Sequence, residues 1–495
     1  MRALGAISRV LGAGLISAAA GFIWNPCHAQ TLGPFSDTSG VVALPGLNSS
    51  QFAMAQSINN VCPTISQSSV FTTPGQHDLA NICTAMIVNS LQVENMPTPA
   101  GAPSFGLGAG GLANALSQLN GGTELVVPTS QASTLQNMQY NLQTGVIEAR
   151  LSMLRDRLMT GRAFASGDSP QAVQFAAAGA PDAIRYTQVA QAPPPLNLSA
   201  WNGRLGLFLT GIGQFGDRDT TANENGYSFD NAGFVGGADY FFTPRLVGGA
   251  AFSYTRANTN FDTSATSPAG QFLRGDNFQG NIYATYAATS ALYFNGIATI
   301  GGSDNFSRRV VVIPSFSPTM AAVNRAASGS FGGRNYAGSL GAGYNMPFGA
   351  WVVTPTARFQ YTYARADSFT ENGGSGVDLT YGSSHYNAAQ SFIGGQVSYT
   401  MTTAWGPLLP TGHFQWAHQY NSGNTAVSVA YSNDPLFLSN FSMPGDRTDR
   451  DYFDVGIGLT LTPAPNRSLY LTYDAILGLS HTTYNTLTGG IRIAF

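Results

Sequence analysis

Charged side chains are scarce in this chain of 495 residues. Only 9% of the residues are Asp, Glu, Lys or Arg, and all 22 basic residues are arginine, whereas an average globular protein is about 25% charged. The formal net charge of −3 gives no indication of a nucleic-acid partner, because such proteins present a strongly basic surface. The apolar share of 43% is also low for a bundle of membrane helices. The composition therefore fits neither an ordinary water-exposed surface nor a helical membrane protein.

Long apolar runs are missing beyond the N-terminus. Residues 1–29 begin with the basic Arg2 and Arg9, continue with the apolar stretch 10–23 and end with small residues before Gln30, which predicts a cleaved secretory signal peptide. No later segment offers a run of about 18 strongly apolar residues. If the mature chain crosses a membrane, we expect it to cross with β-strands.

Cysteine is almost absent, and the mature sequence keeps only Cys62 and Cys83. Both lie in segments, 50–62 and 77–91, whose apolar residues recur at helical spacing, and Pro63 is expected to end the first helix. Because export leads to an oxidising compartment, we expect a disulfide that joins the two helices. The alternative is a pair of free, buried thiols.

Alternating segments fill the second part of the chain. In 352–365, 451–462 and 468–479 nearly every second residue is apolar, with polar residues or glycine between, as in β-strands that are apolar on one face. A soluble sandwich would show the same alternation. However, these segments have 12 or more residues, about twice the usual length of soluble strands, and aromatic residues cluster toward their ends, as in the interfacial girdles of membrane barrels.

Twelve such segments are connected alternately by short turns and long polar loops. The short turns are 241–245, 289–292, 346–350, 402–406 and 462–467, and the long loops lie near 216–226, 260–275, 307–332, 366–384 and 420–449. Only the last gap, near 480–483, departs from this rule. Tight turns on one side and long loops on the other are typical of outer-membrane barrels. The sequence therefore predicts an all-β transmembrane barrel of about 12 antiparallel strands over residues 201–495.

The polar faces of these strands are predicted to line the lumen, because a wide barrel needs polar walls whether or not it conducts. The lumen-lining candidates are Arg358, Gln360, Asp454, Asp474 and Arg492.

The final strand runs to the last residue of the chain, with apolar side chains at Ile491, Ile493 and Phe495. A barrel has no free edge, so we expect this strand to pair with the first one. The terminal aromatic residue then lies at the membrane interface. It resembles the C-terminal signal that the outer-membrane insertion machinery reads.

Four stretches of the barrel region resemble the autotransporter β-domain of type V secretion. They are 201–219, 233–257, 408–420 and 449–459, and the likeness covers roughly residues 200–495. Where the family commonly has an inward-facing Arg and acid, this chain has His413 and Gln415, which argues against a strong lumenal charge pair there. The resemblance implies a barrel that translocates its own N-terminal region, the passenger.

The N-terminal region differs from a common passenger because it has no repeat of 20–50 residues. Residues 30–160 are predicted to form a small helical passenger or plug. Within it, the helix predicted over 133–158 resembles the pore-threading helix of the family. The three basic residues on this pore helix are Arg150, Arg155 and Arg157. The alternative is an ordinary amphipathic helix of a periplasmic domain. Residues 161–200 are predicted to be a flexible, proline-stiffened linker.

No arrangement of residues indicates catalysis. Gly167-Asp168-Ser169 is similar to a lipase motif, but Pro170 follows it and it lies in the linker. The passenger region has no Gly-x-Ser-x-Gly elbow, and His77 is its only histidine after signal removal. Because no His or Cys residues show metal-ligand spacing, we predict no enzyme activity, no metal and no cofactor.

These observations predict an outer-membrane, autotransporter-like barrel of a Gram-negative bacterium that translocates or displays its short N-terminal region at the cell surface. The expected partners are outer-membrane lipid, the insertion machinery and periplasmic chaperones. One alternative is a structural or adhesive surface barrel that acts through its extracellular loops. Another is a passive, porin-like pore for small solutes. The surface ligand, and whether the N-terminal region is cleaved, surface-exposed or periplasmic, stay open.

Overall fold

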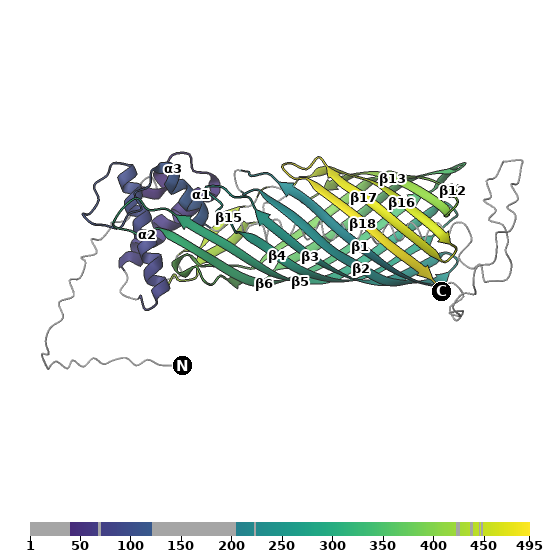
Figure 1. Cartoon of the computed structure of the whole chain (residues 1–495), viewed down its shortest axis with the longest axis horizontal. Helices are drawn as coiled ribbons and strands as arrows, with labels where there is room; N and C mark the ends of the chain where they lie inside the picture. The colour runs from purple at the N-terminus through teal and green to yellow at the C-terminus, as the bar shows by residue number, and fades with distance from the viewer. Residues whose placement is uncertain are drawn as a thin grey trace, which may run out of the picture.

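The computed structural model describes residues 40–67, 71–120, 204–221, 224–421, 426–435, 439–444, 446 and 449–495. These residues form a closed β-barrel with a helical region at one end (Figure 1). Among the described residues, no helix is long and apolar enough to span a membrane. The predicted signal peptide, the predicted pore helix with its three arginines and the predicted linker lie outside the described residues.

Twelve antiparallel strands form the barrel wall, which confirms the predicted fold class and strand number. The strands are β1 (Leu205–Arg218), β2 (Tyr227–Thr243), β3 (Leu246–Phe261), β4 (Phe272–Ala287), β5 (Leu292–Ile313), β6 (Val323–Tyr344), β8 (Trp351–Ala366), β11 (Ser384–Tyr399), β13 (Gly406–Gln419), β16 (Asp451–Ala464), β17 (Arg467–Leu477) and β18 (Tyr484–Ala494). Two short strands, β7 (Met346–Phe348) and β12 (Met401–Thr403), extend the turns.

The first and last strands close the ring. Strand β1 pairs with β18 in a continuous antiparallel register that begins at Gly206 and Ala494. The backbone N–H of Phe495 then donates to the carbonyl oxygen of Leu205 at 2.9 Å. The final residue is therefore held to the first residue of the wall, as expected for a barrel without a free edge.

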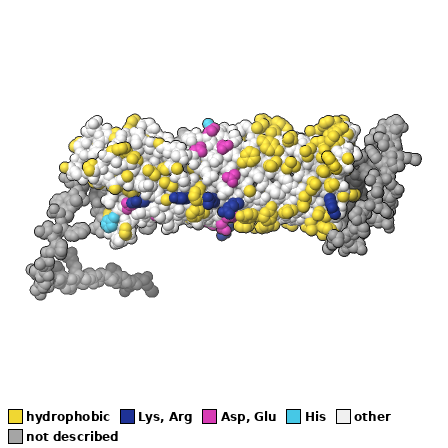
Figure 2. All heavy atoms as spheres, viewed as in Figure 1, with side chains coloured by type: hydrophobic (Ala, Val, Ile, Leu, Met, Phe, Trp, Pro, Cys, Tyr) yellow, Lys and Arg dark blue, Asp and Glu magenta, His cyan; other side chains and the backbone are white. Residues whose placement is uncertain are grey.

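Side-chain alternation follows the predicted period of two. On β17, Leu469 and Leu471 face outward and are about half exposed, whereas Ser468 and Tyr470 between them are buried inside. On the face shown in Figure 2, outward-facing apolar side chains form a dense belt on the half of the barrel that lies away from the helices, and exposed apolar residues occur on strands throughout the wall. Charged side chains gather between this belt and the helices. An apolar band around a barrel is the surface that contacts lipid.

The two ends of the barrel differ. The tight turns, the start of β1 and the C-terminus lie at one end, and the long loops lie at the other end next to the helices (Figure 1). The connection between β17 and β18 is short although it lies on the long-loop side, in agreement with the one predicted departure from the rule.

The long loops contain more secondary structure than the sequence predicted. Strands β5 and β6 extend far into the expected loop 307–332, so their hairpin projects beyond the neighbouring strands. Segments of two other loops form a separate four-stranded sheet in the order β15-β14-β10-β9. These strands are β9 (Phe369–Thr370), β10 (Leu379–Tyr381), β14 (Ala426–Tyr431) and β15 (Phe441–Pro444), and the short helix η5 (Ser375–Val377) precedes β10.

The described residues of 40–120 form a helical region that we call the cap. It contains η1 (Gly40–Ala43), α1 (Ser49–Gln67), α2 (Pro74–Val93) and α3 (Ala109–Leu119). Helix α2 begins with a capping box, in which Thr73 accepts from the Gln76 N–H and the Gln76 side chain accepts from the Thr73 N–H, which satisfies backbone donors that a helix start leaves open. The predicted helices 50–62 and 77–91 are thus confirmed as parts of α1 and α2.

One expectation for the cap was wrong. Helix α1 does not end at Pro63 but continues through it to Gln67. Proline removes a backbone hydrogen bond from a helix, and packing compensates here because Val61 and Cys62 are buried in the core. Cys62 also forms a disulfide with Cys83 of α2, with 5.2 Å between the two Cα atoms. The predicted disulfide is therefore present and joins α1 to α2.

Candidate functional site

The cap and the long loops of the barrel share one hydrophobic core. This contact, which we call the docking face, is the most extensive meeting of distant chain segments outside the barrel wall. The cap contributes buried residues from all three of its α-helices, including Met54, Met86 and Leu112, which are fully buried. The loops contribute Val311, Ile313, Val323, Val377, Leu379, Tyr381, Val427, Val429, Tyr431 and Phe441.

The second half of helix α2 is buried on all sides, whereas Pro74, His77 and Asn81 in its first half are exposed. Its residues 85–91 are buried in an unbroken run, and at about 100° per residue such a run passes around the whole helix. A helix of an independent small domain would keep one solvent-exposed stripe. Because α1 and α3 cover only part of α2, the loop segment around η5 covers another part.

A buried ion pair lies where α3 meets the barrel. The Arg309 and Glu371 side chains are 0% and 1% exposed, and Arg309 Nη2 lies 2.6 Å from Glu371 Oε2. The same guanidinium donates to the carbonyl oxygens of Gln118 at 3.0 Å and of Val377 at 2.6 Å. Arg309 thus joins β5, the loop after β8 and the last turn of α3, whose free carbonyls favour a cation.

Glu371 is held by further hydrogen bonds. Its carboxylate accepts from the Leu379 N–H at 3.0 Å and from the Tyr381 hydroxyl at 3.3 Å. A charge pair that is removed from water is stable only if its remaining polar atoms find partners, and this pair meets that condition. The pair therefore fixes the position of the cap rather than adding a large net stability.

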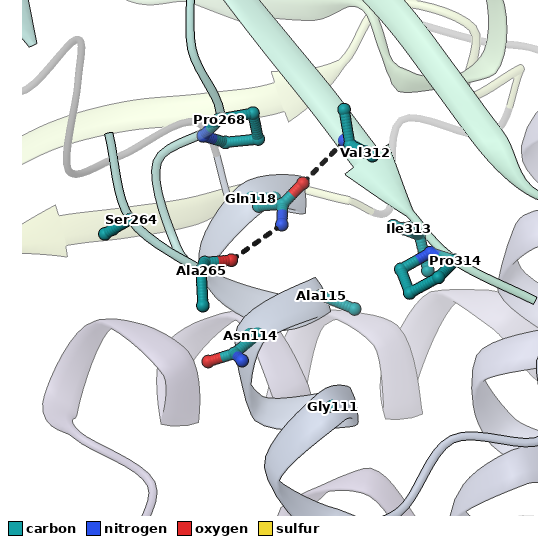
Figure 3. A pocket seen from close by; sticks show the side chains of 10 residues that line it. All are labelled: Gly111, Asn114, Ala115, Gln118, Ser264, Ala265, Pro268, Val312, Ile313 and Pro314. Carbon is teal, nitrogen blue, oxygen red and sulfur yellow. Dashed lines mark hydrogen bonds between the residues drawn. The ribbon is translucent and has the colours of Figure 1, made fainter. Parts of the chain in front are cut away.

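Gln118 connects three segments with its side-chain amide. Its Nε2 donates to the Ala265 carbonyl oxygen at 2.9 Å, and its Oε1 accepts from the Val312 N–H at 2.6 Å (Figure 3). Beside it lies a cavity of about 340 Å³ between α3, the β3–β4 loop and the end of β5. The cavity is lined by Gly111, Asn114, Ala115, Gln118, Ser264, Ala265, Pro268, Val312, Ile313 and Pro314.

The start of α2 is fixed against η5 by a close backbone approach. The Gly376 N–H donates to Asp78 Oδ2 at 3.0 Å, and Arg325 Nη2 lies 3.5 Å from Asp78 Oδ1. A Cβ atom at Gly376 would collide with the backbone nitrogen of Leu79. Glycine is therefore required at this position for the helix to reach the loop.

Burial shifts the acidity of two groups in the loops under the cap. Burial raises the pKa of the Asp378 carboxyl, and the nearby negative charge of Glu371 raises it further, although a hydrogen bond from the Gly374 N–H opposes this shift. Burial also raises the pKa of the Tyr431 hydroxyl. Burial therefore disfavours the charged forms of both groups relative to water.

The predicted lumen-lining residues all lie on the face opposite to the exposed apolar belt, but they form separate groups. The Arg358 guanidinium lies 3.8 Å from the centre of the Phe392 ring and donates to Gln360 at 3.3 Å. Arg492 lies 3.4 Å from Asp239 on a neighbouring part of the wall.

Asp454 and Asp474 approach each other through a histidine. His413 Nε2 lies 3.4 Å from Asp454 Oδ1 and 3.7 Å from Asp474 Oδ1. The register explains this group, because His413 is paired with Gly456 and Gly456 with Asp474 on three adjacent strands. The sequence pointed to His413 only as a departure from a family pattern.

The residues of the docking face were missed by the sequence analysis. Arg309 and Glu371 lay in regions predicted as long loops, and no local motif distinguishes Arg309 from its neighbour Arg308. Among the described residues, no group of three or more His, Cys, Asp or Glu is placed to hold a metal.

Comparison with known proteins places the barrel in context. The family model described as "Autotransporter beta-domain" matches residues 207–474. Outer membrane protein A of Rickettsia conorii is 28% identical over 244 residues, which are 48% of this chain and 11% of that protein. Outer membrane protein A of Rickettsia rickettsii is 26% identical over a stretch of the same length, 10% of that protein. This chain therefore spans about a tenth of the length of these curated relatives.

Solved structures that this chain resembles include a translocator domain and a β-domain of two autotransporters. The translocator domain of the autotransporter NalP from Neisseria meningitidis aligns with a TM-score of 0.46 at 12% identity, over 60% of this chain and 91% of that chain. The β-domain of the Bordetella autotransporter BrkA aligns with a TM-score of 0.40 at 15% identity, over 59% of this chain and all of that chain.

Proposed function

Because the chain belongs to the autotransporter β-domain family, we propose that its barrel translocates the N-terminal region across the outer membrane and displays the cap at the cell surface. The protein is an outer-membrane β-barrel of a Gram-negative bacterium. Barrels of this family rely on the outer-membrane insertion machinery and are generally not enzymes. Export by a cleaved signal peptide and escort by periplasmic chaperones are parts of the same proposal.

The observation that carries this proposal is the position of the cap. It packs on the long loops, through Gln118 against the β3–β4 loop and through Asp78 against η5. In outer-membrane barrels the short turns are periplasmic and the long loops are extracellular. A cap that is seated on the long loops therefore lies outside the cell.

The connectivity supports translocation through the barrel. The cap ends at Asn120 next to the long loops, and the wall begins at Arg204 next to the short turns, where the Arg204 carbonyl oxygen accepts from Phe241. Residues 121–203 connect these two ends. The wall is closed by hydrogen bonds between neighbouring strands, so the lumen is the route inside the molecule. We assign the polar wall residues Arg358, Gln360, Asp454, Asp474 and Arg492 to this route, together with His413.

The proposal is tested by locating the cap on intact cells. A protease-sensitive epitope tag inserted after Gln30 should be cleaved by protease added to intact cells. The same tag in the β3–β4 loop, between Thr263 and Ser264, is the surface control, and the tag in the short turn at Gly349 is the periplasmic control. A tag after Gln30 that is cleaved only when the outer membrane is permeabilised would contradict surface display and would favour a periplasmic domain.

The runner-up function, a structural or adhesive barrel that acts through its loops, is not favoured by a particular contact. Apolar side chains of three loops, such as Val323, Leu379 and Val429, face the cap instead of the surroundings. Any adhesive surface would therefore belong to the cap together with the loops.

A further inference from the structure

We infer that the cap is an obligate lid: it completes its core only on the barrel loops and stays bound there without a covalent link when the chain behind it is cut. This inference rests on the proposed function for its location at the cell surface, but its molecular basis is the docking face alone. The partner of the loops is thus residues 40–120 of the same chain.

The cap differs from an independent domain because part of its helical surface is covered by the barrel loops and not by solvent. A small domain buries a modest share of its surface, and the core of a short three-helix domain needs support beyond its own apolar contacts. In this cap even the inner helix α2 relies on outside cover, since Gly376 and Val377 pack against its first turns. Without the loops, Leu79 and the first turns of α2 would lose this cover.

The loops depend equally on the cap. In the four-stranded sheet β15-β14-β10-β9, Val427, Val429 and Tyr431 of β14 are buried, and the intervening Ser428 is exposed. One face of this sheet is therefore apolar and is covered by α1, where the Ser57 hydroxyl donates to the Ser439 carbonyl oxygen at 3.4 Å. Removing the cap would expose an apolar patch on the most accessible part of the protein, which proteins generally avoid.

Arg309 makes the docking specific. Its guanidinium is completely buried and uses the Gln118 carbonyl oxygen of α3 as one of its acceptors. If the cap left, Arg309 would lose this acceptor and its cover, and a buried charge that loses partners is strongly destabilising. The neighbouring Arg308 points to the other side of the same strand and is exposed.

These contacts join the cap to the barrel through side chains and an apolar core, independently of residues 121–203. Cleavage in that segment would therefore produce a two-chain complex and not a released passenger. The cap would still cover the end of the barrel that carries the long loops.

The test uses the full mature chain with a protease recognition sequence inserted between Gly122 and Thr123, purified in detergent. After complete cleavage, native gel filtration measures how much of the cap fragment co-elutes with the barrel. We expect nearly complete co-elution for the otherwise unchanged protein. With Arg309→Met, we expect the affinity of the cap fragment to fall by about a hundredfold or more. Arg308→Met removes the same charge one residue away and should behave like the unchanged protein.

A second pair of variants tests the same face by shape instead of charge. Gly376→Ala places a Cβ against the Leu79 backbone and should weaken retention about tenfold. Gly108→Ala in the cap is the control, because its Cβ would meet no atom within 4 Å. Resistance of the barrel band to unfolding by detergent without heating shows in each case that the wall has assembled.

Separation of the unchanged cap fragment after cleavage would overturn the inference. Equal retention of the Arg309→Met and Arg308→Met proteins would overturn the role of Arg309. Because the assay uses purified protein, either result leaves the surface-display experiment unaffected. Conversely, a cap fragment that stays bound supports the lid even if the tag on intact cells is protected.

Discussion

Strand β5 passes through two environments, and the comparison of its two halves shows how the molecule is organised. In the wall, its inward face carries polar residues such as Thr299, Ser303 and Ser307. Beyond the neighbouring strands the same face carries Val311 and Ile313, which are fully buried in the core shared with the cap. The period of two is unchanged, so alternation tells which residues share a face but not what covers that face.

The wall and the docking face are also held together differently. Each wall strand is bonded to two neighbours through its backbone, and the ring has no edge. The cap is attached mainly through side chains, together with a backbone hydrogen bond from the Phe316 N–H to the Phe105 carbonyl oxygen at 2.8 Å. Arg309 lies at the boundary between the lumenal and the apolar part of β5. We therefore expect the wall to survive loss of the cap.

The most severe test of this difference is to delete residues 30–160, which removes the cap and the predicted pore helix. A twelve-stranded barrel is wider than an eight-stranded one, whose interior side chains alone can fill. We expect a folded barrel whose single-channel conductance in planar bilayers is severalfold larger than that of the mature protein. Equal conductance would mean that neither the cap nor residues 133–158 close the lumen. A deletion that fails to fold would refute the independence of the wall.

The next largest effect is expected at the closure of the wall. Replacing Phe495 with Ser should reduce the amount of protein in the outer membrane to a minor fraction, because the last strand then lacks its terminal aromatic residue at the interface. Phe495→Tyr, which keeps an aromatic ring, should insert normally. The measurement is the heat-modifiable band in outer-membrane fractions. Normal levels of the Ser variant would rule out Phe495 as an insertion signal, while the observed pairing of β18 with β1 would stand.

Much of the wall could be predicted from sequence because lipid and lumen impose opposite polarity on alternate residues. Ile457 and Leu459 of β16 face lipid, and Asp454 lies on the other face. The disulfide followed from compartment and helical spacing, because only Cys62 and Cys83 were available to pair.

The docking face could not be predicted because its partners are distant in sequence. Arg308 and Arg309 have the same side chain. Only the contacts of Arg309 with Gln118 and Glu371 distinguish it as the buried residue that joins the cap to the barrel. The apolar run 310–313 lies within the long polar segment 307–332, which the sequence predicts as a loop. The continuation of α1 through Pro63 likewise depends on the core that surrounds the helix.

Removal of the disulfide should have an effect of intermediate size, and this effect should be confined to the cap. Closing a loop with a sequence separation of 21 residues should stabilise the cap by about 3 kcal/mol in the chain-entropy model. The Cys62→Ser, Cys83→Ser double variant should lower the free energy of unfolding of the cap by that order, measured with denaturant, without changing the heat-modifiability of the barrel. Alkylation and intact-mass measurement of the unreduced protein provide the control, since two alkylated thiols would show that no disulfide forms in the native protein.

The smallest expected effect concerns pH and again separates the docking face from the wall. Burial raises the pKa of Asp378 above its ordinary value, with Glu371 nearby adding to the shift and Arg309 opposing it. The folded loop after η5, under the cap, therefore holds this proton at pH values where the unfolded chain, with an Asp pKa of about 3.9, has released it. The resulting stability is fully present below the unfolded pKa and is lost as the pH rises through the folded pKa. Unfolding of the docking face, which the loop and the cap share, should thus become slightly easier as the pH is raised from about 4 toward neutrality. Asp378→Asn, whose side-chain oxygen can still accept from the Gly374 N–H, should flatten this dependence. If the melting temperature of the cap in the variant falls with pH as steeply as in the unchanged protein, Asp378 is not its source.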